Sequence, residues 1–436
     1  HLLSIVELNL AENTNNVNKY VEAIEILNMA IQIDPDRADN YNNLGLAYHY
    51  LREYKKAQIY IEKAIEKDPN NFLFFNNLAL QYRFLGDYDE AIKCLKKSIE
   101  LKNLPNTWTN LGGIYGDLKD LTQSEACYKT ALEMAPNYAG AHVDLAFAYH
   151  LQGKWEEGFR EYEWRFEYFP TLNFYIQKYD QSKRWDGAKD LKDKTILLYG
   201  EQGLGDTIQF VRYVPKLKEL GAKRTIIHCP ASLNETIKKC SGIDDVVNLD
   251  IVTGDKNELP HYDYQCSLIS LPHLLKCVHL GGKPYIKPSK ILDIKSQYPN
   301  TFNIGISWAG SPAHPNDELR SVKLKYFKPI HDIPNVKLFN LQVDMRKRMY
   351  KHGIKTIDLT AGCDDLKIVD MTEMINTFED SSSIIAGLDL VISCDTALIH
   401  LAGAMGVPCW VLIPYAQDWR WCSYGETTPW YDSICL

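Results

Sequence analysis

The chain has 436 residues, of which 45% are hydrophobic and 24% are charged, and its formal net charge at pH 7 is -8. This length exceeds one ordinary hydrophobic core, so we expect two or three domains, and the composition is that of a folded globular protein. The acidic balance provides no basic surface for nucleic acid or anionic lipid, so neither class of partner is expected.

The first 170 residues contain an internal repeat. Aligning the chain with itself superposes YNNLGLAYHYL, FNNLALQYRFL and WTNLGGIYGDL, and the leucines Leu44, Leu78, Leu111 and Leu145 recur at intervals of 34, 33 and 34 residues. This interval is the period of the tetratricopeptide repeat, a pair of helices, and the small and aromatic positions agree with it. We therefore predict an α-solenoid of about five repeats over residues 1–170.

One polar position recurs in the first helix of each predicted repeat. Its residues are Asn9, Asn43, Asn77, Asn110 and Asp144. A row of side-chain amides offers donors and acceptors to an extended peptide backbone, and this row resembles the asparagine ladder in the superhelix of O-GlcNAc transferases. We predict a peptide groove at this row. The alternative is that asparagine is merely common in such repeats and faces solvent.

The rest of the chain alternates apolar strands with helices. We expect strands at residues 194–200, 224–230, 244–249, 302–310, 336–342, 354–360, 388–396 and 407–414. Apolar strands joined by helices indicate parallel sheets that are buried on both faces. We predict two Rossmann-like domains, at 171–299 with the connector and at 300–436, which bind ligands at the carboxyl ends of their strands.

Four motifs in this region carry a family resemblance. They are GEQGLGDTIQFVRYVP, ISWAGSPAHPNDELRS, LDLVISCDTALIHLAGAMGVPCWVLIP and DWRW followed by TTPWY. Together they resemble the catalytic region of bacterial tetratricopeptide glycosyltransferases, which is similar to the ADP-heptose heptosyltransferases. The resemblance covers nearly the whole chain. It implies a GT-B fold, inverting and metal-independent chemistry, an acceptor at the first Rossmann-like domain and a nucleotide-sugar donor at the second.

The glycine turn GEQGLGD contains the two candidate catalytic carboxylates. The resemblance implies that Asp206 is the base that takes the proton of the acceptor hydroxyl, with Glu201 as the reserve candidate. Gly203, Leu204 and Gly205 then belong to the acceptor side, where glycine lets the backbone approach a sugar closely. The alternative from the residues alone is that Asp206 caps the following helix.

The donor phosphates are expected at the start of the helix after strand 388–396. The free amides, the Thr396 hydroxyl and the positive end of the helix dipole form an anion site there. The other candidate donor contacts are Asp395, Ala397, His400, Gly403, Arg320, Ser311, Gly310, Trp308 and Asn316. Arg320 matches a phosphate-binding lysine of the heptosyltransferases. The alternatives are a helix cap for Asp395, a buried structural role for His400 and a solvated Arg320.

The tail of the chain offers Trp419, Trp421 and Trp430, which either stack on a ligand or pack the lobes together. We favour packing. GT-B chains usually end with a helix that crosses back to the first lobe. This chain reaches Leu436 without one, so either the chain is truncated or that role falls elsewhere. The chain begins with His1, so we expect the native N-terminus to lie upstream; a removed targeting signal is an open alternative.

The eleven cysteines are scattered, with no zinc-like spacing, and are expected to be reduced thiols of a cytoplasmic protein. The predicted function is a metal-independent inverting glycosyltransferase that needs no cofactor beyond its nucleotide-sugar and acts on a protein recruited by the repeats. Relatives with this layout modify flagellin or other surface proteins. Two alternatives stay open: a lipopolysaccharide or lipid-linked glycan as acceptor, and a non-catalytic scaffold whose lobes bind a nucleotide-sugar.

Overall fold

The computed structural model describes residues 17–248, 259–311, 317–343, 365–415, 417–421 and 425–436. The chain divides into two compact units, His1–Gln152 and Gly153–Leu436, called here the repeat unit and the α/β unit. This division falls earlier than the predicted boundary after residue 170. The segment 153–170 belongs to the α/β unit because its side chains pack into that unit, as described below.

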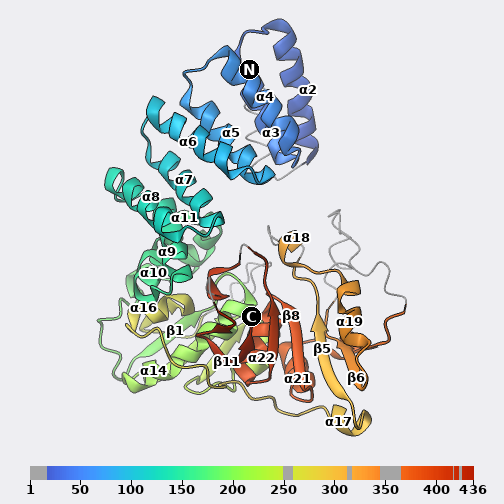
Figure 1. Ribbon diagram of the computed structural model, residues 1–436. Coiled ribbons are helices and arrows are strands. Elements are labelled where there is room, and N and C mark those ends of the chain that lie inside the picture. The colour runs from blue at the N-terminus through green and yellow to red at the C-terminus, as the bar shows by residue number, and fades with distance from the viewer. Residues whose placement is uncertain (1–16, 249–258, 312–316, 344–364, 416, 422–424) are drawn as a thin grey trace. The chain divides into compact units, whose positions relative to one another are not determined.

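The repeat unit consists of helices that stack in sequence order (Figure 1). They are α2 (Val17–Ile33), α3 (Ala38–Tyr50), α4 (Tyr54–Lys67), α5 (Phe72–Leu85), α6 (Tyr88–Leu101), α7 (Pro105–Asp117), α8 (Leu121–Met134) and α9 (Ala139–Leu151). Three successive pairs, α3 with α4, α5 with α6 and α7 with α8, form the predicted hairpins. The first helix of the first predicted repeat, with Asn9, lies outside the described residues.

Small residues set how closely paired helices approach. The recurrent leucines are all buried, as are Ala57 and Ala91 at the helix crossings. A Cβ at Gly45 would lie 2.5 Å from Cγ1 of Ile61, and a Cβ at Gly112 would lie 2.6 Å from Cε1 of Tyr128. The repeat period therefore reflects a buried leucine and a close contact between paired helices in each repeat.

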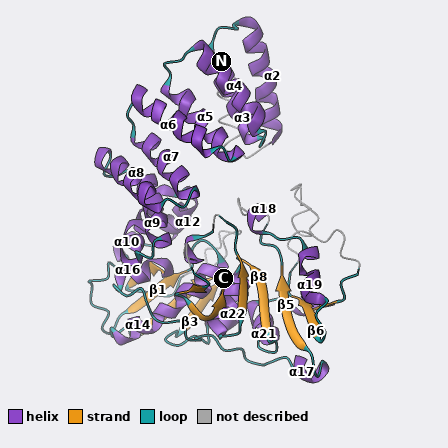
Figure 2. Cartoon of the chain, viewed as in Figure 1, coloured by secondary structure: helices purple, strands orange, loops and turns teal. Residues whose placement is uncertain are grey.

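The α/β unit begins with short helices and then contains two parallel sheets, seen as strands in Figure 2. The leading helices are α10 (Trp155–Glu161), η1 (Tyr162–Trp164), α11 (Arg165–Tyr168), η2 (Pro170–Leu172), α12 (Asn173–Lys178) and η3 (Gln181–Lys183). Aromatic side chains from this segment, among them Phe166, Tyr175 and Tyr179, pack against Leu197 and Tyr199 of the first strand. The leading segment is thus part of the core of the first lobe.

The first lobe holds a parallel sheet with the strand order β3-β2-β1-β4. Its strands are β1 (Thr195–Tyr199), β2 (Arg224–Cys229), β3 (Asp245–Asn248) and β4 (Tyr264–Ser267). Its helices are α13 (Leu204–Phe210), η4 (Val211–Tyr213), α14 (Val214–Glu219), η5 (Ala231–Leu233), α15 (Asn234–Ile237), η6 (Leu268–Ser270) and α16 (Leu271–Leu274). The sequence analysis had not predicted β4.

The second lobe holds a sheet with the order β10-β11-β9-β8-β5-β6-β7, parallel except for the β10–β11 hairpin. Its strands are β5 (Phe302–Ser307), β6 (Val336–Asn340), β7 (Ile368–Asp370), β8 (Leu390–Cys394), β9 (Cys409–Leu412), β10 (Thr427–Thr428) and β11 (Tyr431–Cys435). Its helices are α17 (Ile294–Gln297), α18 (Asp317–Arg320), η7 (Leu324–Phe327), α19 (Lys328–His331), η9 (Thr372–Met374), α21 (Phe378–Ile385), α22 (Ala397–Met405) and η10 (Trp419–Trp421). The strand expected at 354–360 lies outside the described residues.

Each sheet has one point where the strand order reverses. In the first lobe it lies between β1 and β4, and in the second between β5 and β8. Open parallel sheets bind ligands outside the carboxyl ends of their strands at such points. The loop after β1 leads to Asp206, and the loops after β5 and β8 lead to Arg320 and Thr396. The topology therefore places the predicted residues at both reversal points.

Residues of the tail contact both lobes. Strand β11 pairs with β9 in the second sheet. The Arg212 guanidinium, from the first lobe, donates to the carbonyl oxygen of Trp430 at 2.6 Å and lies over the rings of Tyr285 and Tyr431. Of the two roles considered for the tail tryptophans, packing is the one observed, because Trp419, Trp421 and Trp430 are all buried.

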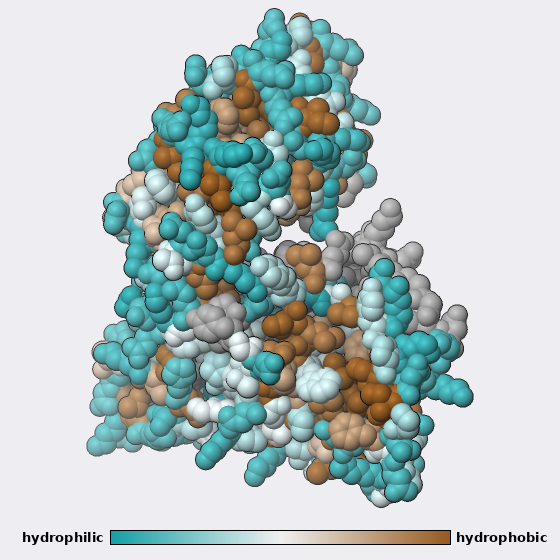
Figure 3. Space-filling view, in the orientation of Figure 1, coloured by the Kyte–Doolittle hydropathy of each residue, from teal (hydrophilic) through white to brown (hydrophobic). Residues whose placement is uncertain are grey.

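Apolar side chains also reach the surface of the molecule, as the brown areas of Figure 3 show. The largest exposed ones in the repeat unit include Met29, Ile33, Leu73 and Phe84. Phe84 stacks on Tyr54 with ring centroids 4.6 Å apart, so part of this surface is an aromatic cluster held between neighbouring repeats.

Candidate functional site

The glycine loop after β1 leads into helix α13, whose first turn carries Asp206. Gly203 is the N-cap of α13, and the Asp206 carboxylate accepts a hydrogen bond from the Gly203 backbone N–H at 2.9 Å through Oδ2. Asp206 is therefore the third residue of the helix and not its N-cap, which corrects the capping alternative. Gln202 adopts a left-handed backbone with φ of 61° and exchanges hydrogen bonds with the Tyr162 hydroxyl. Such conformations cost energy in residues other than glycine and are found preferentially at functional sites.

The glycines of this loop serve packing. A Cβ at Gly200 would lie 2.3 Å from Oγ1 of Thr207, and a Cβ at Gly205 would lie 2.7 Å from Cδ2 of His400. On the side of Gly205 where a Cβ would lie, the space is filled by His400 of the second lobe. This close approach lets α13 pack directly on α22.

Asp206 forms an ion pair across the two lobes. Its Oδ1 accepts a hydrogen bond from Nη2 of Arg420, and both side chains are about nine-tenths buried, with 10% and 11% exposure. The Arg420 guanidinium also donates through Nη1 to Oδ1 of Asp418 at 2.7 Å and lies 4.3 Å from the ring centre of Trp419. Both oxygens of Asp206 therefore have partners inside the protein.

A tryptophan cluster lies behind this ion pair. The rings of Trp155 and Trp430 meet edge to face with centroids 5.1 Å apart, and Trp155 also lies 6.4 Å from Trp419. Phe159 adds edge contacts to Trp419 and Trp430. This cluster, defined as Trp155, Phe159, Trp419 and Trp430, supports the segment that carries Arg420.

Glu201 belongs to a separate, fully buried ion pair. Its Oε1 accepts a hydrogen bond from Nε of Arg165 at 2.7 Å, and neither side chain is exposed to solvent. Arg165 also donates to Glu163 at 2.7 Å and to the Ser270 hydroxyl at 2.8 Å. Burial raises the pKa of Glu201, while Arg165 lowers it. This geometry favours a structural role, in which Glu201 fixes the leading segment to the glycine loop, over a role as reserve base.

The start of α22 lies next to the start of α13. Thr396 is the N-cap of α22, and its Oγ1 lies 3.3 Å from the Ser393 hydroxyl, so Asp395 is not the cap. A Cβ at Gly205 would lie 3.5 Å from the Cα of Ala397, the first residue of α22. The first amides of α22 and the carboxylate of α13 therefore occupy one region of the α/β unit.

Arg320 reaches the same region from the loop after β5. Its Nη1 donates to the carbonyl oxygen of Asp395 at 3.0 Å, and its Nε lies 3.5 Å from Oδ1 of Asp317. Burial raises the pKa of the Asp395 carboxyl to about 6, and the charge of Asp418 adds to this effect, whereas Arg420 and Arg320 oppose it. Arg320 is therefore not a solvated surface arginine.

His400 is a packed residue of the lobe contact. Its Nδ1 lies 3.0 Å from the Tyr431 hydroxyl, and its ring stacks on Trp421 with centroids 5.2 Å apart. Burial lowers its pKa to about 3, helped by the nearby Arg420 charge, so the imidazole is neutral at pH 7. This environment favours the structural alternative over a direct contact with an anionic donor.

The other predicted donor contacts divide into packing residues and loop residues. A Cβ at Gly403 would lie 2.7 Å from the Tyr431 ring, and Trp308 is buried in the core of the second lobe. Gly310 makes room for Arg320, because a Cβ there would lie 2.3 Å from Nη2 of that arginine. Ser311 is partly exposed beside this loop, and Asn316 lies outside the described residues.

The region therefore combines two guanidinium groups with four carboxylates. Arg320 and Arg420 are the cations, and Asp206, Asp317, Asp395 and Asp418 are the acids. Guanidinium groups beside a helix N-terminus suit a phosphate ligand. Arg420 and Asp418 were not among the predicted site residues, although both belong to the motif DWRW that carries part of the resemblance.

The predicted amide row of the repeat unit takes part in bonds between repeats. Asn77 Nδ2 donates to Oδ1 of Asn42 at 2.8 Å, and Asn110 Nδ2 donates to Oδ1 of Asn76 at 3.1 Å. Asn43 accepts from its neighbour Asn42 at 3.4 Å. Each carboxamide has two donor hydrogens and two acceptor lone pairs, so one internal bond leaves capacity for a ligand. The row therefore has a structural role that does not exclude the predicted groove.

Asp144, the last member of the row, differs from the asparagines. Burial raises the pKa of its carboxyl to about 6, although the charge of Arg83 opposes the rise. Arg83 itself forms a two-bond ion pair with Asp117, at 2.5 and 2.9 Å. A carboxyl group with a raised pKa distinguishes this end of the row from its amide positions.

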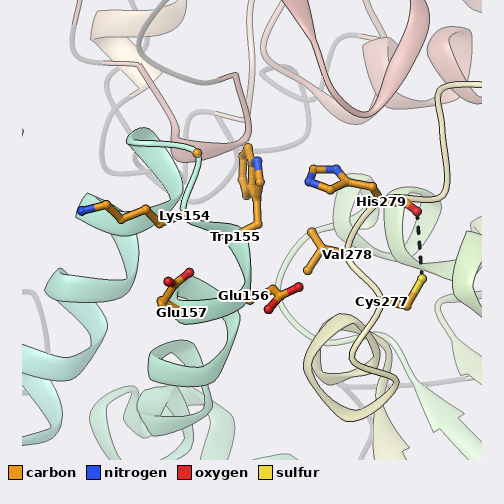
Figure 4. Close-up of a pocket in the computed structure, with 8 residues that line it drawn as sticks. Lys154, Trp155, Glu156, Glu157, Cys277, Val278 and His279 are labelled. Carbon is orange, nitrogen blue, oxygen red and sulfur yellow. Dashed lines mark hydrogen bonds between the residues drawn. The ribbon is translucent and has the colours of Figure 1, made fainter.

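A separate cavity of about 410 Å³ lies in the α/β unit at the start of α10 (Figure 4). Its lining includes Trp155 and His279, whose rings meet edge to face with centroids 6.5 Å apart, together with the side chains of Glu156 and Glu157. None of the predicted catalytic or donor residues lines it. The cavity shares only Trp155 with the tryptophan cluster.

Three further findings concern the described residues alone. No group of three or more His, Cys, Asp or Glu side chains has a metal-binding arrangement there. Within the same residues, no helix combines the length and the apolar character that crossing a membrane requires. The nine cysteines in the described part of the chain are free thiols, and burial raises the pKa of Cys394 and Cys409 to about 12.

Comparison with known families identifies the repeats. Tetratricopeptide-repeat families match residues 18–51, 38–71, 60–93, 105–138 and 127–159. The chain carries tetratricopeptide repeats. Repeats of this kind typically bind protein partners, and they suggest a scaffold for protein interaction.

The comparison with curated proteins extends beyond the repeats. Protein FlbA of Caulobacter vibrioides is 22% identical over 400 aligned residues, which include 75% of this chain and 63% of FlbA. The chain thus spans less than two thirds of the length of FlbA. Three quarters of the chain is more than either unit contains, so the similarity includes residues of both units.

Three solved structures are similar to about two fifths of the chain. MamA is 18% identical and covers 37% of this chain and 93% of its own, with a TM-score of 0.32. PilW, a type IV pilus biogenesis factor, is 21% identical over 41% of this chain and 86% of its own, with a TM-score of 0.35. YrrB, described as a tetratricopeptide-repeat protein with an unusual peptide-binding site, is 21% identical over 40% and 92%, with a TM-score of 0.29.

Proposed function

We propose that the α/β unit transfers a sugar from a nucleotide-sugar donor to a hydroxyl group of a protein acceptor, and that the repeat unit recruits this acceptor. The observation that carries the proposal is the meeting of Asp206 with the start of α22 and two arginines at the reversal points of both sheets. A glycosyl transfer with inversion needs a carboxylate for the acceptor hydroxyl and positive charge for the leaving diphosphate. Both are present in one region.

The roles follow from the placement of each group. Arg320 and the first amides of α22 would bind the diphosphate, so the metal-independent reaction of the resembling family suits this charge arrangement. Asp206 would accept the proton of the acceptor hydroxyl, which attacks the anomeric carbon as the bond to the diphosphate breaks. In this proposal the nucleotide-sugar is a co-substrate, and no further cofactor is required.

The recruitment of a protein rests on the repeats and on the amide row. Bonds to a peptide backbone contribute about 0.5 to 1.5 kcal/mol each, so we expect single changes in the row to have mild effects. Replacing Asn43, Asn77 and Asn110 together by alanine should raise KM for the protein acceptor by about an order of magnitude without affecting donor hydrolysis. A glycan acceptor, the alternative substrate, would show an unchanged KM in this variant.

A non-catalytic scaffold is the second candidate function. It is favoured by the repeats and by the engagement of both Asp206 oxygens within the protein. The decisive experiment incubates the protein with candidate nucleotide-sugars and a protein acceptor isolated with it, and measures the acceptor by mass spectrometry. Transfer by the wild-type protein that is lost in Asp206→Asn supports the enzyme. Nucleotide-sugar binding without transfer supports the scaffold.

A further inference from the structure

We propose that Arg420 is shared between two anions: its Nη2 donates to the Asp206 carboxylate when the donor site is empty and to the donor diphosphate when the donor binds, which releases Asp206 for the acceptor. The inference rests on the proposed function and adds a residue and an order of binding to it. The donor would bind first, because only then is the carboxylate available to the acceptor hydroxyl.

The first step of the argument concerns Asp206. A base must present a carboxylate oxygen to the hydroxyl group whose proton it takes. Here Oδ2 is engaged by the Gly203 N–H, and Oδ1 is engaged by Arg420. The guanidinium places a positive charge where the proton would arrive, which opposes proton transfer. The observed arrangement therefore needs one change before Asp206 acts, and the loss of the Arg420 contact is that change.

The second step concerns Arg420. Its guanidinium has five N–H donors in a planar fork, a geometry that binds carboxylates and phosphates equally well. It lies on the face of Trp419, 4.3 Å from the ring centre, and Asp418 holds Nη1 at 2.7 Å. These two contacts keep the guanidinium in place while the partner of Nη2 changes. Arg420 thus has one donor group, Nη1, that Asp418 holds in place and one, Nη2, that can exchange its partner.

The third step concerns the distance to the donor site. Gly205, next to Asp206, packs against Ala397 at the start of α22. Arg420 is bonded to Asp206, the neighbour of Gly205, and Trp421, the neighbour of Arg420, stacks on His400 of α22 with ring centroids 5.2 Å apart. Arg320 donates to the backbone oxygen of Asp395, which directly precedes the N-cap of α22, at 3.0 Å. Both arginines therefore lie beside the start of α22. The carboxylate partner of Arg320 is Asp317, at 3.5 Å from its Nε, and not the proposed base Asp206.

The test is a double-mutant cycle on the binding of nucleoside diphosphates, measured by calorimetry on the full chain with ADP, CDP, GDP and UDP. Asp206→Asn should tighten the binding of the cognate nucleotide about fivefold, because Nη2 of Arg420 then has no carboxylate that competes with the diphosphate. Arg420→Gln should weaken it about tenfold or more, and Arg420→Lys should weaken it less. In the double variant the gain from Asp206→Asn should disappear.

The matched control is Asp245→Asn, which removes a carboxylate from the exposed pair with Arg224 at the amino end of β3. This variant should bind nucleotide like the wild type. Thermal melts of every variant identify any that fails to fold, and the Arg420→Lys result then stands in for Arg420→Gln.

The outcomes separate the two proposals. If Asp206→Asn binds nucleotide no more tightly than the wild type, or if its gain persists in the Arg420→Gln background, the shared role of Arg420 is wrong while the proposed function stands. If the wild-type protein binds none of the four nucleotides, the donor site itself is wrong and the inference falls with it.

Discussion

The repeat unit and the α/β unit place their polar contacts at very different distances along the chain. In the repeat unit, the amide bonds join residues 34 or 35 positions apart, about one repeat. In the α/β unit, the ion pair of Asp206 with Arg420 joins residues 214 positions apart. Contacts that recur in every repeat produce a period in the sequence, from which they can be predicted. A single contact between two lobes produces no period.

This difference predicts where single substitutions act. Each repeat contacts mainly its neighbours, so a change there should be felt over one or two helix pairs. The α/β unit connects two sheets and a leading segment through a few buried charges, so a change there should affect the whole unit. The predictions below test this contrast, in order of decreasing expected effect.

The largest effect is expected from Arg165→Met. Loss of this arginine leaves Glu201 as a buried carboxylate without its partner, which costs about 3 to 5 kcal/mol of the free energy of unfolding. Hydrogen exchange followed by mass spectrometry should show lost protection throughout the α/β unit and unchanged protection in the repeat unit. The double variant Arg165→Met with Glu201→Met should recover most of the loss. A single variant as stable as the wild type would contradict the structural role assigned to this pair.

Asp144→Asn is expected to stabilise the repeat unit at neutral pH. The carboxyl pKa is raised to about 6 in the folded protein, so the folded state disfavours the charged form. The raised pKa lowers the free energy of unfolding by at most about 3 kcal/mol. This contribution has its full size above pH 6 and disappears as the pH falls toward 4. The variant should therefore melt at a higher temperature than the wild type at pH 7 and at the same temperature near pH 4. The control Asp117→Asn, which loses the ion pair with Arg83, should instead destabilise at pH 7.

Glycine substitutions compare close contacts within each unit. Gly45→Ala places a methyl group 2.5 Å from Ile61, and Gly205→Ala places one 2.7 Å from His400. Each should cost about 1 to 3 kcal/mol, as measured by chemical denaturation, but Gly205→Ala alone should also disturb the nucleotide site. Gly116→Ala is the control, because its methyl group would lie at an ordinary 3.5 Å from the Ser124 hydroxyl. If Gly116→Ala destabilises as much as Gly45→Ala, the steric account is wrong.

The smallest effect is expected from Asn77→Ala. It removes one bond between repeats, to Asn42, and should cost about 0.5 to 1.5 kcal/mol. Exchange rates should rise in α3 and α5 and remain constant in α8 and the α/β unit. Asn106→Ala, an exposed position in α7, provides the comparison. Equal losses of protection in all repeats would show that the solenoid unfolds as one body and that its contacts are not local.

Much of the fold could be predicted from the sequence. The leucine period defined the helix pairs, and apolar runs identified strands such as β1, β2, β5 and β8, because these segments are almost wholly buried. The apolar run of β9 was identified in the same way, although its Trp410 is exposed. Strands β4 and β11 were not predicted, since β11 (YDSIC) alternates burial only weakly and follows an aromatic loop. Their place in a sheet is decided by distant neighbours.

The candidate site could be predicted only in part. The strand and glycine turn before Asp206, and the strand and helix start at Thr396, are local signals and were found. The pairing of Asp206 with Arg420, of Glu201 with Arg165, and of Gly205 with His400 arises from tertiary packing. The sequence showed which residues were acids, bases or glycines but not which of them would meet.

The tryptophan cluster behind Arg420 has a spectroscopic consequence. Every tryptophan of the chain except Trp108 belongs to the α/β unit, so the intrinsic fluorescence of the protein reports almost entirely on that unit. The Arg420 guanidinium lies on the face of Trp419, and a cation against an indole ring shifts its emission. The protein therefore contains its own optical probe at the contact between the lobes, one that needs no label and that circular dichroism of the helical repeats would complement.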